Sequence, residues 1–311
     1  MTSDTAVQGA WRGADRRRSL VARAAAGQTV PVASIVLAIV MIWYAAAVWV
    51  NADLVRTTNP AAATMGAADF VGATWSHERP RLPAPHQVVG ELRQSILDTP
   101  VTSRRSLVFH GWVTLESTLL GFLFGTLLGI VLAILIVHVK TLEKSLMPWV
   151  VASQTVPILA VAPIVIVVLG AIGITGSIPK AIISAYLCFF PVAIGMVKGL
   201  NAPDPMQLDV LRTVNASPTQ TFWKLRWPAS VPFLFASLKV AIAISLVGAI
   251  VGELPTGAQA GLGARLLAGS YYGQTIQIWA ALFTAAALAA SLVALVGLVE
   301  RIVLKAMGSE P

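Results

Sequence analysis

The chain has 311 residues and a net charge of +8, with 56% hydrophobic but only 12% charged side chains. Soluble domains carry about 25% charged residues, and the mean hydropathy of +0.77 points the same way. The apolar residues are grouped into blocks of about 20, which is the length that a bilayer requires of a helix. Composition therefore excludes an ordinary soluble domain and predicts a multi-span membrane protein. In such a protein, positive charge sets topology, so we expect no binding of nucleic acid.

Six apolar blocks are long enough to cross a bilayer as helices, the only open-chain structure that satisfies its own backbone in lipid. The blocks are Val32–Val50, Val113–Val137, Trp149–Ile172, Ile178–Val197, Val231–Gly252 and Ile276–Val299. No small-residue cleavage site follows the first block, so we expect it to be retained as a span. The predicted fold class is an all-α integral membrane protein with six transmembrane helices.

Lys and Arg are distributed unevenly between the two sides of these spans. With the N-terminus inside, the inner segments hold 13 of them and the outer segments hold 8. Because cytoplasmic segments are enriched in Lys and Arg, we expect both termini to lie in the cytoplasm, in a bacterial inner membrane. The predicted organisation is a tail over 1–31, a first span over 32–50, an extracytoplasmic loop over 51–112, a five-helix core over 113–305 and a tail over 306–311.

Four of the five prolines in the predicted outer loop, Pro60, Pro80, Pro83 and Pro85, lie before residue 86. Proline fixes φ and removes a backbone donor, so extended structure is expected through much of the loop. Apolar residues at helical spacing over 88–97 predict a short amphipathic helix at the outer surface.

The segment between the fourth and fifth spans has a pattern of its own. Apolar residues at helical spacing predict a first helix over Met206–Val214, and Asn215 is suited to end it because asparagine tolerates left-handed backbone. Ser217 and Pro218 are typical of the N-cap and first turn of a second helix, which is expected to end before Pro228. The sequence predicts a helix–turn–helix on the cytoplasmic surface.

This segment, residues 201–230, resembles the cytoplasmic loop of binding-protein-dependent ABC permeases, whose pattern is E-A-A-x3-G-x9-I-x-L-P. Asp209, Val210 and Leu211 stand at E-A-A, and Asn215 stands at the glycine. The isoleucine and the L-P pair are matched by Leu225, Trp227 and Pro228. Four other stretches resemble the nitrate, sulfonate, taurine and thiamine-precursor branch of these permeases, namely 110–122, 153–170, 189–199 and 261–263.

The resemblance implies a type I importer permease, commonly a homodimer, whose loop binds a separate ABC ATPase. An extracytoplasmic binding protein would deliver the substrate, and ATP binding would switch the spans from inward-facing to outward-facing. The residues expected to form the ATPase-coupling loop are Asp209, Val210, Leu211, Arg212, Asn215, Ala216, Phe222, Trp223, Leu225, Trp227 and Pro228.

Within this loop, Phe222, Trp223 and Leu225 are the candidates for an apolar anchor, because aromatic side chains are enriched in interface cores. Arg212, Lys224 and Arg226 have two interpretations. They pair with acidic residues at the rim of the ATPase, or they only enforce topology.

No sequence motif for catalysis is present. There is no Walker A loop, no G-x-S-x-G elbow and no His/Cys cluster. We therefore expect no catalytic residue, no metal and no cofactor, with ATP hydrolysed on another polypeptide. The alternative is a secondary transporter, which predicts inverted repeats and intramembrane acidic residues. No repeat is evident, and at most one acidic residue lies in the middle of a span.

Three polar residues in the third predicted span are candidates to line the substrate pathway: Ser153, Gln154 and Thr155. Pro157 and Pro163 free backbone carbonyls nearby, and such freed groups are tolerated where they line a cavity. Ordinary hydrogen bonding between helices is the alternative.

Three ionisable residues, in or near the predicted spans, are further candidates for a functional role, because charged side chains are costly in a membrane. Glu116 faces the pathway or lies at the outer interface. Lys239 is expected to have a structural role near the cytoplasmic gate. Glu253, with the glycines of 257–263, indicates an outer gate or a bent re-entrant segment, or else a simple exposed turn. From the resemblance, the substrate is a small organic solute or anion, with sulfonates, nitrate and pyrimidine vitamin precursors all open.

Overall fold

The computed structural model describes residues 29–255 and 260–308, and these residues form helices and connecting turns without a strand. They divide into two compact units, one ending at Val89 and the other beginning at Gly90. Five helices are long and apolar enough to cross a membrane, and a bent pair makes up to six. The prediction of an all-α membrane fold is confirmed.

The first unit is built on α2 (Thr29–Thr58), which is longer than the predicted 32–50 span at both ends. It continues through a 3-10 helix, η1 (Pro60–Ala63), and α3 (Ala67–Trp75). The expectation of extended structure through much of this segment is therefore wrong. Proline suits the first position of a helix, and Pro60 takes that position in η1 while Asn59 caps it with a 3.0 Å bond from the Ala61 N–H.

Asn51 ties this unit together, and its side chain is fully buried. Its Nδ2 donates to the carbonyls of Thr74 and Leu82 at 3.3 and 2.8 Å. Its Oδ1 accepts from the N–H groups of Arg81 and Leu82 at 2.8 and 3.2 Å. All four hydrogen-bonding positions of the amide are used, which fixes the irregular stretch after α3 against α2.

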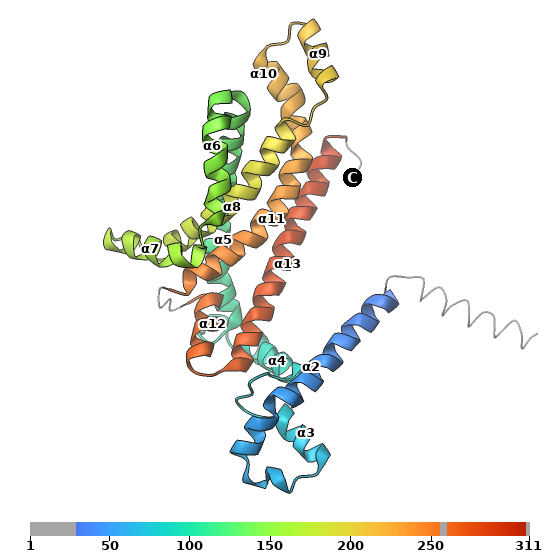
Figure 1. Cartoon of the computed structure of the whole chain (residues 1–311), viewed down its shortest axis with the longest axis vertical. Helices are drawn as coiled ribbons and strands as arrows, with labels where there is room; N and C mark the ends of the chain where they lie inside the picture. The colour runs from blue at the N-terminus through green and yellow to red at the C-terminus, as the bar shows by residue number, and fades with distance from the viewer. Residues whose placement is uncertain (1–28, 256–259, 309–311) are drawn as a thin grey trace, which may run out of the picture. The chain divides into compact units, whose positions relative to one another are not determined.

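The boundary between the units falls within α4 (Pro85–Arg93), which a π-helix, η2 (Gln94–Asp98), follows. A helix was predicted over 88–97. The remaining helices of the second unit are α5 (Leu107–His138), α6 (Lys140–Ala152), α7 (Ile158–Ala171), α8 (Ser177–Leu200), α9 (Pro205–Thr213), α10 (Pro218–Thr221), α11 (Trp227–Glu253), α12 (Leu262–Tyr271) and α13 (Thr275–Ala306) (Figure 1).

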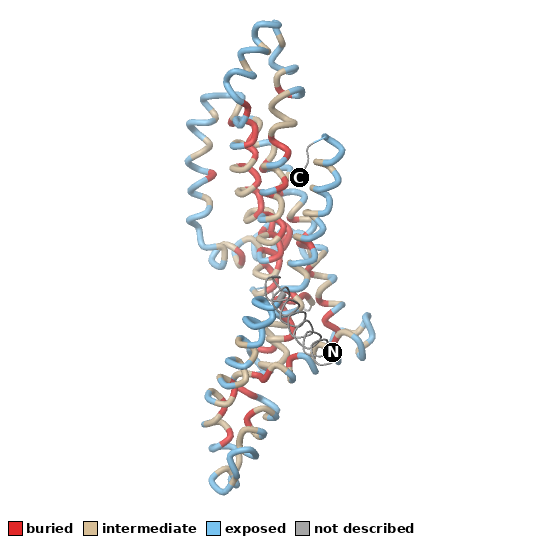
Figure 2. Tube along the Cα trace, turned by 90° about the vertical axis from the view of Figure 1, so that its right-hand side faces the viewer, coloured by how far each residue is buried: buried red, intermediate tan, exposed pale blue. Residues whose placement is uncertain are grey.

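Helices α5, α8 and α11 pack closely at the centre of the second unit, where Figure 2 shows most of the buried residues. Gly121, Gly125 and Gly129 repeat every four residues on the face of α5 that meets α8. A Cβ added to any of them would come within 2.8 Å of a backbone oxygen of α8. Small residues allow such close approach between helices in a membrane.

Two serines link the same three helices where they pack together. The Ser245 hydroxyl of α11 donates to the carbonyl of Thr118 in α5 at 2.9 Å. The Ser184 hydroxyl of α8 donates to the carbonyl of Ser245 at 2.7 Å. All three residues are fully buried, so the two serine hydroxyl groups have hydrogen-bond partners inside the apolar core.

The third predicted span, Trp149–Ile172, is not one helix. It is divided between α6 and α7, which meet at 99° around a short 3-10 turn, η3 (Ser153–Thr155). Pro157 explains the break, because it lacks an N–H and biases Val156 away from helical backbone. Val156 has φ −78° and ψ 120°, and α7 begins directly after Pro157.

Candidate functional site

The segment that carries the family motif begins with α9, whose first turn is tightly capped. Asp204 is the N-cap, and its side chain accepts the Met206 N–H at 2.8 Å. In return the Gln207 side chain accepts the Asp204 N–H at 3.3 Å. Pro205 occupies the first helical position, where its missing N–H costs nothing. The local sequence thus fixes where this helix begins.

The turn after α9 is built around Asn215, whose φ is 51°. The Ala216 N–H bonds to the carbonyl of Leu211 at 2.9 Å, and the Asn215 N–H bonds to that of Arg212 at 3.0 Å. This pair of bonds is the Schellman motif, which satisfies the last carbonyls of a helix and usually has glycine at the left-handed position. Asparagine takes that position here.

A second capping box starts α10 immediately after the turn. The Ser217 hydroxyl accepts the Gln220 N–H at 3.2 Å, and the Gln220 side chain accepts the Ser217 N–H at 2.8 Å. Three consecutive local motifs therefore hold α9, the turn and α10 in one arrangement, which makes the segment stiff.

The expectation that the second helix ends before Pro228 is wrong. After α10 the chain makes a π-helical turn, η4 (Phe222–Arg226), and runs directly into α11. The Trp227 N–H reaches back five residues to the carbonyl of Phe222. A single π turn inside an α-helix is rare and often lies at a functional site. Here it leads directly into α11, in which Pro228 is the second residue.

The stretch from α9 through η4, residues 205–226 and here called the α9–α10 segment, exposes an apolar stripe. Met206, Val210 and Val214 lie at positions i, i+4 and i+8 of one helical face and are 75%, 57% and 68% exposed. Trp223, after the turn, is 60% exposed. A hollow of about 270 Å³ lies between α9 and η4, and its lining consists of Gln207, Val210, Leu211, Lys224 and Leu225.

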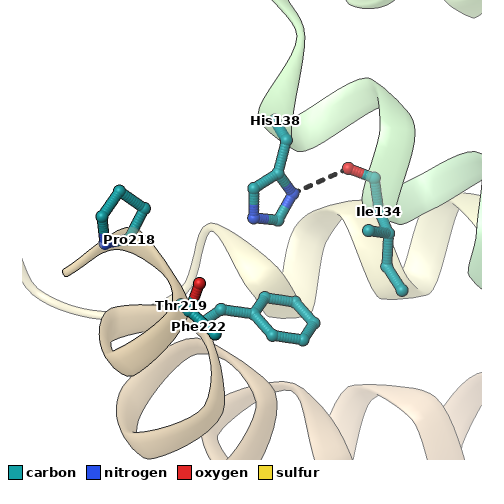
Figure 3. A pocket seen from close by; sticks show the side chains of 5 residues that line it. All are labelled: Ile134, His138, Pro218, Thr219 and Phe222. Atoms are coloured by element: carbon teal, nitrogen blue, oxygen red, sulfur yellow. Dashed lines mark hydrogen bonds between the residues drawn. The ribbon is translucent and has the colours of Figure 1, made fainter.

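Phe222 lies on the inner side of this segment and is only 8% exposed. Its ring lies 5.3 Å from that of His138, at the end of α5, and 6.0 Å from that of Trp227. Phe222 and His138 line a hollow of about 200 Å³ together with Ile134, Pro218 and Thr219. Figure 3 shows Ile134 and His138 on one side, facing Pro218 and Thr219 on the other. Phe222 therefore packs the start of η4, directly after α10, against the end of α5. This leaves Trp223 as the exposed aromatic of the three predicted anchor residues.

The charges of the segment are surface charges. Arg212 pairs with Asp209 one turn earlier at 2.8 Å, with both side chains largely exposed. Lys224 is exposed and Arg226 is half-buried. An exposed pair of this kind contributes little to stability, so these groups are available to a partner.

The candidate pathway residues Ser153, Gln154 and Thr155 form the turn at which α6 and α7 bend apart. Gln154 and Thr155 are exposed, whereas Ser153 is half-buried and its carbonyl accepts the Tyr186 hydroxyl at 2.5 Å. Glu116, the fourth candidate, is exposed on α5 and accepts the Ser177 hydroxyl at 3.0 Å. The structure does not bring Glu116 into hydrogen-bonding contact with this turn.

Two other ionisable residues of the spans have partners. Lys239 in α11 forms an ion pair with Glu300 in α13. Glu253, at the end of α11, is fully buried and bonded to Thr114 and Gly263. The simple exposed turn considered for Glu253 is therefore wrong. Of the glycines associated with it, Gly257 lies outside the described residues. Sequence patterns gave no sign of these partners, because each lies on a different helix.

Comparison with known proteins defines the class of this multi-span protein. The family of binding-protein-dependent transport system inner membrane components matches residues 125–309. A probable ABC transporter permease protein of Haemophilus influenzae is 31% identical over 62% of this chain and 80% of its own length.

Two relatives have names that state a substrate. The riboflavin transport system permease protein RibX of Chloroflexus aurantiacus is 30% identical, over 72% of this chain and 80% of its own length. The putative aliphatic sulfonates transport permease protein SsuC of Bacillus subtilis is 29% identical, over 70% and 82%.

These matches identify a membrane-embedded transport subunit of the ABC class. The chain belongs to the family of binding-protein-dependent transport system inner membrane components, and it is the permease subunit of an ABC importer.

Proposed function

We propose that the α9–α10 segment is the surface by which this permease binds a separate ATPase subunit, which hydrolyses the ATP that drives import. The stiffness of the segment supports this, because a docking element must transmit force without deforming. Two capping boxes and a Schellman turn hold it, and the stripe of Met206, Val210 and Val214 is apolar and exposed. Aromatic and apolar residues of this kind form interface cores.

The test is co-purification of the permease with its ATPase after Trp223 and Val210 are both changed to Ala. Truncating a central apolar contact costs roughly 1–3 kcal/mol, so we expect at least tenfold weaker retention of the ATPase. Tyr271→Ala is the matched control, because Tyr271 is an exposed aromatic at the end of α12 and should leave retention unchanged. Undiminished retention in the double variant would refute this docking surface.

The assembly we propose contains two copies of this permease, two ATPase subunits and an extracytoplasmic binding protein. It lies in the bacterial inner membrane with both permease termini in the cytoplasm, as the distribution of Lys and Arg favours. In this assembly the turn of Ser153, Gln154 and Thr155, together with Glu116, lines the substrate pathway.

The substrate we propose is a small organic solute or anion, such as a sulfonate, nitrate or a pyrimidine vitamin precursor. The names of the relatives support this class, since they include a riboflavin and an aliphatic sulfonate permease. Thermal-shift measurement of the partner binding protein against these compounds identifies the ligand. Stabilisation by none of them would exclude sulfonates, nitrate and pyrimidine vitamin precursors as the substrate.

A further inference from the structure

Glu253 lies at the end of α11 that is distant from the α9–α10 segment. From Pro218 to Glu253 the chain forms one helical run of 36 residues, which is about 54 Å at the rise of an α-helix. Figure 1 shows α9 and α10 at one end of α11 and α12 at the other. Thus α10 and Glu253 belong to one continuous helical run.

The Glu253 carboxylate is fully buried and joins four helices. Thr114 of α5 donates its hydroxyl to the carboxylate at 3.0 Å, and Lys180 of α8 lies 3.9 Å from it. The N–H of Gly263, in the first turn of α12, donates at 2.7 Å. A buried carboxyl group is costly unless it is paired and hydrogen-bonded, so these donors offset part of the cost of burying it.

The start of α12 is held to α5 by two more bonds around the same carboxylate. The Leu262 N–H donates to the Thr114 hydroxyl oxygen at 2.8 Å, and the Gly261 N–H donates to Nδ1 of His110 at 3.0 Å. Because His110 accepts through Nδ1, its other nitrogen carries the proton and donates to the Arg104 carbonyl at 2.9 Å. Three successive N–H groups at the start of α12, those of Gly261, Leu262 and Gly263, therefore donate to this one cluster.

The two glycines at the start of α12 lie where α11 leaves no room for a side chain. Gly261 has φ +122°, and a Cβ there would lie 2.2 Å from Cδ of Glu253. A Cβ on Gly263 would lie 2.4 Å from the carbonyl oxygen of Ile250. The sequence Gly261-Leu262-Gly263 thus lets the backbone close around Glu253. This contact gives a physical reason for the family resemblance of residues 261–263, which lie far from the α9–α10 segment.

We propose that Glu253 is a positioning residue that couples the α9–α10 segment to α12 during transport. When the ATPase moves α10, the continuous helix displaces Glu253 from Thr114, Lys180 and Gly263, and this frees the first turn of α12 from α5. In the state described here the cluster holds that turn closed. The inference rests on the proposed docking of the ATPase. It adds that the movement of the ATPase acts on Glu253 and the first turn of α12.

The test is hydrogen–deuterium exchange on the intact permease–ATPase complex, without nucleotide and with ATP trapped by vanadate. We expect the amides of residues 261–263 to exchange at least tenfold faster in the trapped complex. Unchanged exchange there, with altered exchange in residues 205–221, would overturn the inference and leave the docking surface intact. If neither region changes although the ATPase is retained, the docking assignment and this inference both fail.

Glu253→Gln provides a second measurement, because it keeps the shape of the side chain but removes the charge facing Lys180. We expect the amides of 261–263 to exchange at least threefold faster without nucleotide, so that the effect of trapped ATP becomes smaller. Glu143→Gln is the matched control, since Glu143 is exposed on α6. A full nucleotide response in Glu253→Gln would show that the charge of Glu253 does not hold the turn and would overturn the proposal.

Discussion

Asn215 is the single residue other than glycine with a left-handed backbone in the described part of the chain. That conformation costs most L-residues roughly 1–2 kcal/mol, whereas asparagine and glycine adopt it more readily. The position thus explains why asparagine can replace the glycine of the family pattern without loss of the turn. The Ala216 N–H, bonded to the Leu211 carbonyl, reports on whether the turn is intact.

We expect Asn215→Val to open this turn, because a β-branched side chain is the least compatible with positive φ. A cost of about 1 kcal/mol corresponds to roughly fivefold faster exchange of the Ala216 amide, measurable by hydrogen–deuterium exchange. Asn215→Gly is the control and should exchange at the rate of the wild type. Equal rates in all three proteins would show that the left-handed residue does not limit the turn.

Among the secondary-structure elements, the sequence predicted the helix starts and turns that are fixed by hydrogen bonds between neighbouring residues. Ser217 and Pro218 start a helix where their types predict one, and the turn falls at Asn215. The π turn before Pro228 was not predictable, because it depends on how α11 continues into the core. Hydropathy located the spans but not the bend of 99° between α6 and α7, since the block Trp149–Ile172 is without a charge on both sides of Pro157.

The candidate site was predictable to the same degree. The coupling segment carries a motif in consecutive residues, so its helices and turn follow from the sequence. The burial of Phe222 against His138 depends instead on residues far apart in the chain. The same holds for Glu253, whose partner Thr114 is 139 residues away. Neither contact leaves a periodic pattern that a sequence alone reveals.

The close packing of α5 against α8 predicts that two glycines of α5, Gly125 and Gly111, differ in how well they tolerate a side chain. A Cβ at Gly125 would come 2.8 Å from the carbonyl oxygen of Ala185, whereas a Cβ at Gly111 meets nothing within 4 Å. We expect Gly125→Ala to destabilise the protein by about 1–3 kcal/mol through overpacking. Gly111→Ala should be neutral or stabilise it by up to about 1 kcal/mol.

The measurement is the midpoint of thermal unfolding of each variant in detergent, compared with the wild type. A lower midpoint for Gly125→Ala alone is the expected result. Similar midpoints for the two variants would mean that α5 and α8 separate easily at this position.

For the whole molecule, the orientation in the membrane is open to a direct test, because the chain has one cysteine. Cys188 is fully buried, so a membrane-impermeant thiol reagent should not reach it. In cells that express the permease without its ATPase, which would cover Val214, we expect such a reagent to label Tyr272→Cys in intact spheroplasts but Val214→Cys only after the membrane is permeabilised. Both positions are exposed in the structure, so the reverse pattern would place the α9–α10 segment outside and contradict the proposed docking.

The π turn between α10 and α11 has a consequence for how such permeases diversify. It accommodates one residue more than a regular helical turn, and each residue of an α-helix accounts for about 100° of rotation. Because the wide turn absorbs that residue and with it the rotation of about 100°, deleting a single residue within Phe222–Arg226 would close the turn and leave α10 in nearly the same orientation to α11. A one-residue deletion is therefore a change that this point of the chain can undergo while the α9–α10 segment and the membrane core keep their arrangement.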